Sequence, residues 1–305
     1  MKLPNFTIAG FAKCGTTSLY HYLEEHPEVF LPKRKELHYF TYDKVLRHKD
    51  KGPKDAEMHK FHTRTFNEYK AQYTTVKTEK AIGDISPTYA LYDDGLVYLK
   101  NTLGADTKMI VVVRDPIKRA YSNYLHLIRE NRETESFYDA LQLESERQEK
   151  GYSNFWYYKF ISSYYQHIKR LKGQFEDVLV VTFEEFMQNP EKGIKEIYSF
   201  LEVDDTFIPE NIGTRFNPGG LYKKNILTSF IFERSKLNSF VKSIIPLNSR
   251  VKKIAHSVTN KFKTETPPVD KKSEEFLVDY FKSDVLKLKS EFGVKTEHWN
   301  KGFQL

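Results

Sequence analysis

Short apolar runs alternate with longer amphipathic stretches along most of this chain. The apolar runs have the length and β-branched content of strands, and they cover residues 6–9, 29–31, 109–113 and 178–183. The spacing of apolar positions predicts helices that begin near residue 16 and, further on, over residues 117–129, 135–150, 156–171, 190–201 and 273–292. Because strands that alternate with helices build parallel sheets, we expect an α/β fold with a central, mostly parallel sheet between helical layers.

The turn after the first strand has the composition of an anion-binding loop. Gly10 ends the strand, Gly15 follows five residues later, and Lys13 lies between them. The first turn of the next helix then carries three hydroxyl side chains, those of Thr16, Thr17 and Ser18. A helix N-terminus attracts anions through its free N–H groups, and glycines let the backbone approach phosphate oxygens. We therefore predict an anion site, with an ordinary turn and a solvated lysine as the alternative.

The position of the lysine separates two chemistries. A nucleoside-triphosphate loop reads G-x-x-x-x-G-K-[ST], whereas here Thr16 occupies the lysine position and Lys13 lies inside the loop. The pattern G-x-x-K-x-G-T-T resembles the 5′-phosphosulfate loop of sulfotransferases that use PAPS (3′-phosphoadenosine 5′-phosphosulfate). The resemblance implies a P-loop-like three-layer fold and cofactor contacts from Lys13, Cys14, Gly15, Thr16, Thr17 and Ser18.

A second segment, K-E-L-H-Y-F at residues 35–40, resembles the part of glycosaminoglycan-type sulfotransferases that carries the catalytic glutamate. The resemblance implies that Glu36 is the base and that His38 lies beside it in the site. We expect the aromatic run that follows Glu36 to be a partly buried strand. A histidine on such a strand is equally well explained as a buried structural residue.

The segment from Ala81 to Tyr89 resembles the E-K-[ST]-P-x-Y segment of the same family, which lines the acceptor side. By this resemblance Asp84 and Ser86 would contact the acceptor. Asp84 replaces the family's glutamate, and Ile85 stands where a substrate-reading lysine is often found. This departure weakens the case for an acidic glycosaminoglycan as the acceptor.

The apolar run at 109–113 contains three valines, which is typical of a fully buried parallel strand. Asp115 suits an N-cap and Pro116 suits the first helical position, so a helix should follow. Arg114 then lies at the carboxyl end of a strand, where open α/β sheets bind ligands. R-D-P-x-x-R-A-Y-S resembles the family's 3′-phosphate motif, which implies Arg114 and Ser122 as ligands. An ion pair of Arg114 with a helix is the structural alternative.

The later part of the chain adds a glycine-rich basic loop at 217–225. By resemblance to bacterial sulfotransferases, Gly220 and Lys223 of this loop would close over the nucleotide. Residues 226–265 are basic and weakly patterned, and we predict a helical insertion or lid within a single domain of residues 1–305. His59 and His62 lie three residues apart without a nearby acidic or cysteine partner, so we treat them as surface residues rather than metal ligands.

Composition narrows the remaining choices. The net charge is +7, yet we find no nucleic-acid-binding motif, so a concentrated anion site is the better explanation. No run approaches the roughly 18–20 apolar residues of a membrane span, although peripheral membrane contact stays open. A single cysteine fits a reducing compartment, and we expect a cytoplasmic location.

The resemblance spans nearly the whole chain and implies a PAPS-dependent sulfotransferase. Such an enzyme would release PAP, need no metal, and act on a hydroxyl or amine of a carbohydrate or small molecule. Two alternatives stay open, a P-loop kinase or NTPase and a non-catalytic protein that binds polyanions or membranes.

Overall fold

The computed structural model describes residues 2–214, 216, 221–222, 263–264 and 266–304. Its central sheet has five parallel strands in the order β2-β3-β1-β4-β5. The strands are β1 (Phe6–Gly10), β2 (Val29–Phe30), β3 (Ala81–Ile85), β4 (Lys108–Val113) and β5 (Val178–Thr182). The predicted fold class is confirmed, and β3 is the strand that the apolar pattern did not predict.

The strand β1 lies at the centre of this sheet, paired with β3 on one side and β4 on the other. From β1 the chain passes first to β2 and β3, and then crosses over to β4 and β5. The carboxyl ends of the three central strands therefore share one edge at a point where the strand order reverses. Open α/β sheets bind their ligands at such a point.

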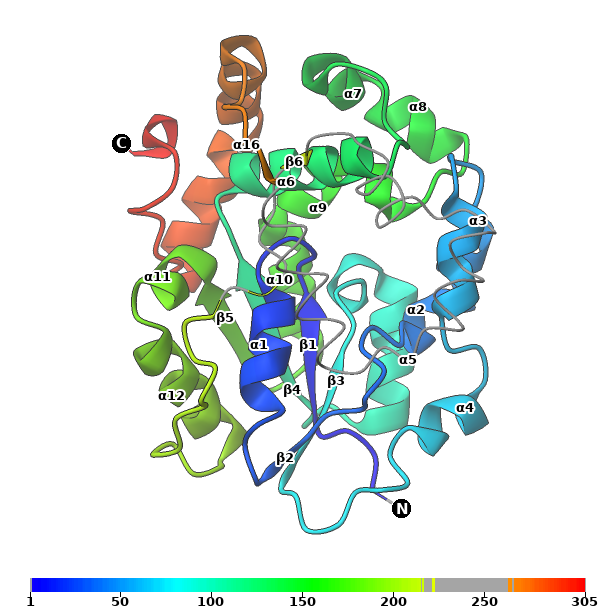
Figure 1. Ribbon diagram of the computed structural model, residues 1–305, viewed down its shortest axis with the longest axis vertical. Coiled ribbons are helices and arrows are strands. Elements are labelled where there is room, and N and C mark those ends of the chain that lie inside the picture. The colour runs from blue at the N-terminus through cyan, green and yellow to red at the C-terminus, as the bar shows by residue number, and fades with distance from the viewer. Residues whose placement is uncertain (1, 215, 217–220, 223–262, 265, 305) are drawn as a thin grey trace.

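Helices cover both faces of the sheet, with α1 (Thr16–Leu23) in front and α10 (Tyr164–Gln174) behind in Figure 1. The other long helices are α5 (Asp93–Leu103), α6 (Pro116–Arg129), α12 (Pro190–Leu201) and α16 (Lys271–Phe292). The short ones are α2 (Tyr39–Tyr42), α3 (Asp55–Met58), α4 (Phe66–Ala71), α7 (Phe137–Gln142), α8 (Glu144–Glu149), α9 (Tyr158–Ser162) and α11 (Phe183–Gln188). A separate antiparallel pair joins β6 (Leu221–Tyr222) to β7 (Lys263–Thr264).

The helix α6 begins where the capping residues predict. The Asp115 carboxylate accepts hydrogen bonds from the N–H groups of Ile117 and Lys118, and Pro116 occupies the first helical position. The remaining Asp115 oxygen accepts from the N–H of Asn300 at 2.8 Å, so the end of the chain is attached to the start of this helix.

Two predicted helices are wrong because each of them is divided into shorter helices, and carboxylates from distant segments cap two of these. The stretch 135–150 holds two helices, α7 and α8, that meet at Leu143. Glu144 begins α8, and its carboxylate accepts hydrogen bonds from the N–H groups of Lys159 and Phe160 at the start of α9. Asp284 of α16 accepts from the N–H groups of Tyr164 and Tyr165 and so caps α10. The stretch 156–171 is divided at Ser163, between α9 and α10.

The expected aromatic strand after Glu36 is also wrong, because the chain turns there into the short helix α2. His38 precedes this helix with a φ of 53°, which is incompatible with a strand. His59 and His62 are not both surface residues, since His59 is buried. Their rings pack in a row with that of His38, with centroid distances of 4.6 Å for His38–His62 and 5.2 Å for His59–His62.

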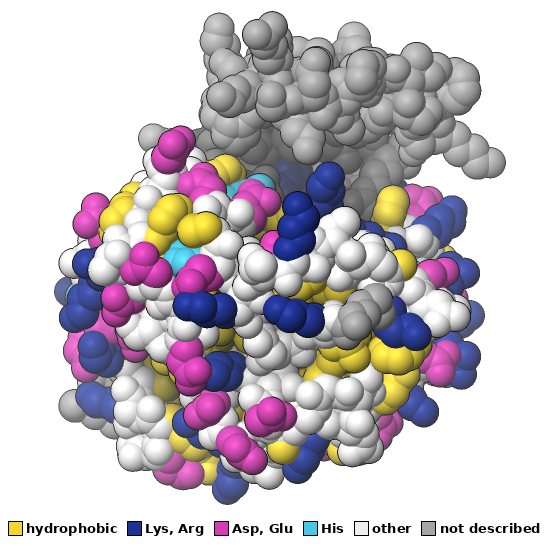
Figure 2. Space-filling view, turned by 90° about the horizontal axis from the view of Figure 1, so that it is seen from below, with side chains coloured by type: hydrophobic (Ala, Val, Ile, Leu, Met, Phe, Trp, Pro, Cys, Tyr) yellow, Lys and Arg dark blue, Asp and Glu magenta, His cyan; other side chains and the backbone are white. Residues whose placement is uncertain are grey.

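The surface in Figure 2 carries basic and acidic side chains interspersed with each other. The positive net charge is therefore not gathered into one patch on that face. The interior is rich in aromatic side chains, and the buried stripe Leu277, Phe281, Val285 and Leu288 holds α16 against the rest of the fold.

Candidate active site

The loop between β1 and α1 forms an anion-binding turn at the central edge of the sheet. Gly15 has a φ of 88°, and a Cβ at this position would lie 2.8 Å from the Phe183 ring. The turn therefore requires glycine for both its backbone conformation and its packing. No described side chain caps the N-terminus of α1, so the N–H groups of its first turn are available to an anion.

The predicted loop ligands do not all face the same way. The Cys14 sulfur is fully buried 3.7 Å from the Tyr164 hydroxyl, and burial raises the pKa of this thiol to about 11. The N–H of Cys14 donates to the Phe11 carbonyl, so this N–H group already has a partner within the turn. Thr17 is half-buried, while Thr16 and Ser18 are buried, and the Ser18 hydroxyl accepts from the N–H of Phe216.

Lys13 lies in the loop in the left-handed region, with a φ of 73°, and is half-buried. Burial, followed by the charges of Arg129 and Arg119, lowers the pKa of Lys13 to about 8. An anion bound in the loop would favour the charged form and reverse this shift.

Arg114 follows β4 and lies beside the same loop. Its Nη1 donates to the Lys13 carbonyl oxygen at 3.1 Å, and its guanidinium group lies 5.0 Å from the centre of the Phe183 ring. Its Nε has no hydrogen-bond partner among the described residues. The structure thus brings Arg114 to the loop, whereas Ser122 lies half-buried on α6 and its role stays a prediction.

Glu36 is connected to the loop through Lys35. The Lys35 amine donates to the Glu36 carboxylate at 2.9 Å and to the Thr17 hydroxyl at 2.8 Å. The other Glu36 oxygen lies 3.9 Å from Nε2 of His38. Burial alone would raise the pKa of Glu36, but hydrogen bonds and charge from His38 and Lys35 outweigh it and hold this pKa well below its usual range. The carboxylate is therefore ionised and available as a proton acceptor at neutral pH.

Asp84 and Ser86, which we predicted to contact the acceptor, are both fully buried in the free protein. The Asp84 carboxylate accepts hydrogen bonds from Ser86, Tyr69 and Tyr89 at 2.7, 3.0 and 2.8 Å. The Ser86 oxygen in turn accepts from the N–H of His38 at 3.0 Å. These two residues support the site from within the core.

Sequence reasoning missed two charged residues of this region. Lys35 could have been found from its position directly before Glu36 in K-E-L-H-Y-F. Arg119 is the second arginine of R-D-P-x-x-R, and it is fully buried with no hydrogen-bond partner for its guanidinium group in the described part of the chain. Its charge lowers the pKa of Lys13, so it adds positive potential beneath the loop.

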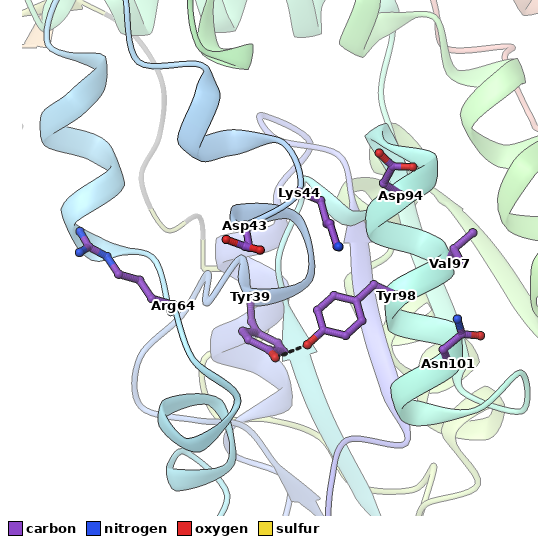
Figure 3. A pocket seen from close by; sticks show the side chains of 8 residues that line it. All are labelled: Tyr39, Asp43, Lys44, Arg64, Asp94, Val97, Tyr98 and Asn101. Carbon is purple, nitrogen blue, oxygen red and sulfur yellow. Dashed lines mark hydrogen bonds between the residues drawn. The ribbon is translucent and has the colours of Figure 1, made fainter.

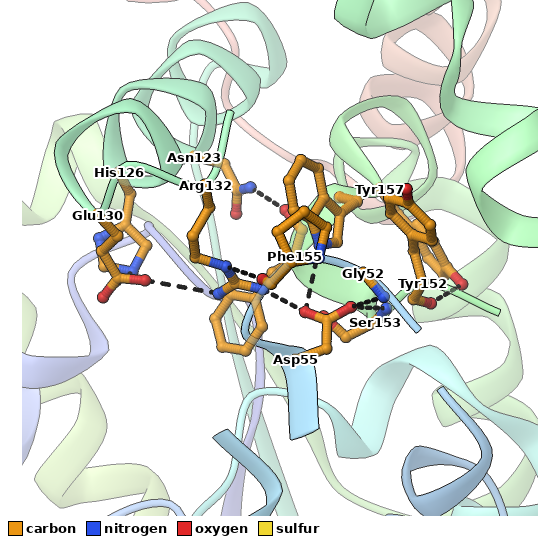
Figure 4. A network of polar contacts seen from close by, with 12 residues as sticks. Gly52, Asp55, Asn123, His126, Glu130, Arg132, Tyr152, Ser153, Phe155 and Tyr157 are labelled. Carbon is orange, nitrogen blue, oxygen red and sulfur yellow. Dashed lines mark hydrogen bonds and ion pairs between the residues drawn. The ribbon is translucent and has the colours of Figure 1, made fainter. Parts of the chain in front are cut away.

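A network around Asp55 holds together the segments beside the site (Figure 4). The Asp55 carboxylate accepts from the N–H groups of Gly52 and Ser153, from the Ser153 hydroxyl and from the Trp156 indole, and it pairs with Arg132. Arg132 also donates to the Pro53 carbonyl. The turn before α3 is thereby attached to the chain that follows α6.

A pocket of about 730 Å³ adjoins the segment that carries Glu36 and His38 (Figure 3). The hydroxyls of Tyr39 and Tyr98 are hydrogen-bonded to each other within it. The pocket combines aromatic surface with hydrogen-bonding groups of both charges, and it is lined by Tyr39, Asp43, Lys44, Arg64, Asp94, Val97, Tyr98 and Asn101.

Some expectations lie outside the described residues, namely Gly220, Lys223 and nearly all of 226–265. Within the ranges that the structure describes, no group of three or more histidine, cysteine, aspartate or glutamate residues could hold a metal ion. No helix of these ranges is long and apolar enough to cross a membrane.

A model of the sulfotransferase family matches residues 4–207, which is more than half of the chain. The chain therefore belongs to the sulfotransferase family. The family assignment does not support either alternative from the sequence, a P-loop kinase or NTPase or a non-catalytic protein that binds polyanions or membranes.

Individual relatives agree with this assignment. The chain is 32% identical over 122 residues to the membrane-associated sulfotransferase kil1 of Dictyostelium discoideum, a match to 40% of this chain and 22% of the relative. It is 30% identical over 175 residues to carbohydrate sulfotransferase 15 of Rattus norvegicus, a match to 46% of this chain and 31% of the relative. The matched parts thus span less than a third of either relative.

A sulfotransferase from Alicyclobacillus acidocaldarius, known from its crystal structure, resembles the whole chain. Its TM-score is 0.76 at 28% identity, and the match covers 98% of this chain and 99% of that one. The β1–α1 loop, Glu36 and Arg114 therefore lie within a fold shared over nearly its full length.

Proposed function

We propose that this sulfotransferase uses PAPS as donor and transfers the sulfuryl group to a hydroxyl or amine of a carbohydrate or small-molecule acceptor. The observation that carries the proposal is the chain of contacts from Thr17 through Lys35 to Glu36. These contacts support Glu36 as a proton acceptor close to the loop that we assign to the donor. In this proposal the proton acceptor lies next to the binding site for the sulfuryl donor PAPS.

The loop fits a phosphosulfate group. Gly15 has the conformation that leaves the N–H groups at the start of α1 open, and Lys13 contributes a nearby positive charge. Arg114, beside the Lys13 carbonyl, is our candidate for the 3′-phosphate, because a guanidinium group suits a terminal phosphate. When bound, PAPS supplies the sulfuryl group and departs as PAP.

The residues of this chain would act before and during transfer. Glu36 accepts the proton that the acceptor loses, a role that typically contributes about 10²–10⁴-fold to the rate. Lys13 and the N–H groups of α1 offset negative charge that builds on the leaving phosphate. The pocket beside α2 has the aromatic and hydrogen-bonding surface that suits a sugar, and the named activity of carbohydrate sulfotransferase 15 supports the same acceptor class.

Calorimetry with PAP and a transfer assay with labelled PAPS test the proposal together. We expect PAP to bind equally well with and without EDTA, and Glu36→Gln to keep that affinity while kcat falls by about 10²-fold or more. Folded protein that does not bind PAP would contradict the donor assignment. Near-normal turnover of Glu36→Gln, with His38→Ala inactive, would instead make His38 the base.

Mass spectrometry of acceptor pools after incubation with labelled PAPS would then identify the acceptor. We further propose a cytoplasmic location, in keeping with the single and buried cysteine.

A further inference from the structure

The segment that carries Lys35 and Glu36 is fixed to two elements of the site. At its start, the Tyr20 hydroxyl of α1 donates to the Pro32 carbonyl at 3.0 Å. At its end, the N–H of Glu36 donates to the carbonyl of Ile85, the last residue of β3, at 3.1 Å. Lys35 lies between these attachments, and its side chain is only 18% exposed. The lysine therefore has a defined place between α1 and the carboxyl end of β3.

The Lys35 ammonium group is shared between the two halves of the site. It donates to the Thr17 hydroxyl of α1 at 2.8 Å and to the Glu36 carboxylate at 2.9 Å. An ammonium group has three N–H donors and no acceptor, so the direction of both bonds is fixed. The third N–H has no partner among the residues that the structure describes. Lys35 can therefore donate to a ligand that arrives at the start of α1.

We propose that Lys35 is a catalytic residue that binds the non-bridging oxygens of the sulfuryl group between α1 and Glu36. The inference deepens the proposed function and rests on it. In that transfer the acceptor oxygen or nitrogen bonds to sulfur, and the bond from sulfur to the phosphate oxygen breaks with its electron pair left on PAP. Glu36 takes the acceptor proton, while Lys35 keeps its own protons and offsets the charge on the sulfuryl oxygens.

Electrostatic repulsion is the reason that a cation is needed at this place. The oxygens of a sulfuryl group carry negative charge, and the Glu36 carboxylate is negative as well. Like charges that approach each other in a partly buried site repel strongly. A cation that already contacts both the carboxylate and α1 reduces this repulsion from the position that it occupies in the free protein.

The neighbouring cations have other positions. Lys13 lies in the loop, where we assign it to the leaving phosphate, and Arg114 donates to the Lys13 carbonyl. Nε2 of His38 lies 3.9 Å from the second Glu36 oxygen, and Nδ1 contacts Thr88. Among the described residues, Lys35 is thus the cation that is bonded both to the first turn of α1 and to Glu36.

Calorimetry with PAPS and with PAP, in the absence of an acceptor, tests this assignment without turnover. PAP lacks the sulfuryl group, so the ratio of the two affinities reports the contacts to that group. Lys35→Met removes the charge and keeps the length of the side chain. It should lower the PAPS affinity by about tenfold or more and leave the PAP affinity unchanged within about twofold. In the transfer assay it should lower kcat by about 10²-fold or more.

Three further variants accompany this measurement. Lys33→Met is the matched control, because Lys33 is an exposed lysine of the same segment, and it should leave both affinities unchanged. Lys35→Arg keeps the charge and should recover part of the lost PAPS affinity. Lys35→Gln takes the place of Lys35→Met if the methionine variant does not fold, and the same selective loss is expected.

Removing Lys35 also leaves Glu36 without this positive partner, so a second background separates the two effects. Glu36→Gln removes the negative charge, and a direct contact predicts that Lys35→Met still lowers the PAPS affinity in this background. A loss that disappears there would show that Lys35 only screens Glu36 and would overturn the proposal. An equal effect of Lys35→Met on PAPS and PAP, or no effect, would also overturn it. Folded wild-type protein that binds neither ligand would instead contradict the proposed function.

Discussion

At the scale of single residues, some charged groups of the site have partners within the protein before any ligand binds. Lys35 neutralises Glu36, and Arg114 is bound to a loop carbonyl. Lys13 differs, because it lies near other positive charges and its pKa is lowered to about 8. The loop therefore has a cation whose charge depends on pH in the range where the enzyme would work.

We expect PAP affinity to fall as the pH rises through about 8. A bound phosphate favours charged Lys13 and raises its pKa, so binding takes up a proton above the pKa of the free protein. Above pH 8 the PAP affinity should fall by about tenfold per pH unit. Well below pH 8, Lys13 is already charged and should not make the PAP affinity depend on pH. Calorimetry across pH, in buffers of different ionisation enthalpy, measures both the affinity and the proton uptake.

Lys13→Arg is the matched control for this prediction. Arginine stays protonated over the whole range, so the variant should lose the slope whatever its absolute affinity. Equal slopes for wild type and variant would show that another group titrates.

At the scale of elements, two kinds of helix start must be distinguished. The start of α6 is capped by Asp115, the residue just before it, whereas α9 and α10 are capped by carboxylates from other segments. The start of α1 has no cap from a described side chain and depends on Gly15 for its shape. An open start of this kind is the one suited to an anion.

Gly15→Ala should therefore weaken PAP binding by about tenfold or more, since the added methyl group meets a positive φ and the Phe183 ring. Gly173→Ala is the control, because Gly173 lies in α10 and no described atom is within 4 Å of the Cβ that alanine would add. It should leave binding unchanged and raise stability by about 0.5–1 kcal/mol. Titration with PAP and thermal unfolding of both variants give the comparison, and wild-type affinity in Gly15→Ala would refute the role of the glycine.

At the scale of the whole molecule, buried polar contacts join segments that are distant in the sequence. Asp55 connects the turn before α3 to residues 132 and 153–156, and Asn300 connects the chain end to Asp115. These contacts keep the segments around the site in place. The family match covers residues 4–207, and the chain end, which lies beyond it, packs back onto the start of α6.

Asp55→Asn should destabilise the fold by up to about 3–5 kcal/mol, because it removes the closer of the two carboxylates that pair with the buried Arg132 and leaves only the longer ion pair with Glu130. Asp43→Asn is the control, since its ion pair with Arg47 is about half-exposed and should contribute less than about 1 kcal/mol. Denaturant unfolding of both variants measures the difference. Similar losses of stability in both would contradict the structural role of the Asp55 network.

The local pattern determined much of this protein by itself. Short apolar runs predicted β1, β2, β4 and β5, and capping residues predicted the start of α6, because strand burial and N-caps depend on neighbours in the sequence. The glycine spacing likewise predicted the open turn before α1. Glu36 and Arg114 were predicted to lie near that loop for another reason, the resemblance of their sequence motifs to those of the sulfotransferase family.

Only the tertiary structure decided the remaining features, since they depend on partners far along the chain. It divided the predicted helices at Leu143 and Ser163, and it placed the carboxylates of Glu144 and Asp284 at the starts of α9 and α10. It buried Asp84 beneath Tyr69 and Tyr89, and it connected Asp84 through Ser86 to the backbone of His38. A hydrogen bond between residues 50 positions apart, such as that of His38 with Thr88, leaves no periodic signal in a sequence.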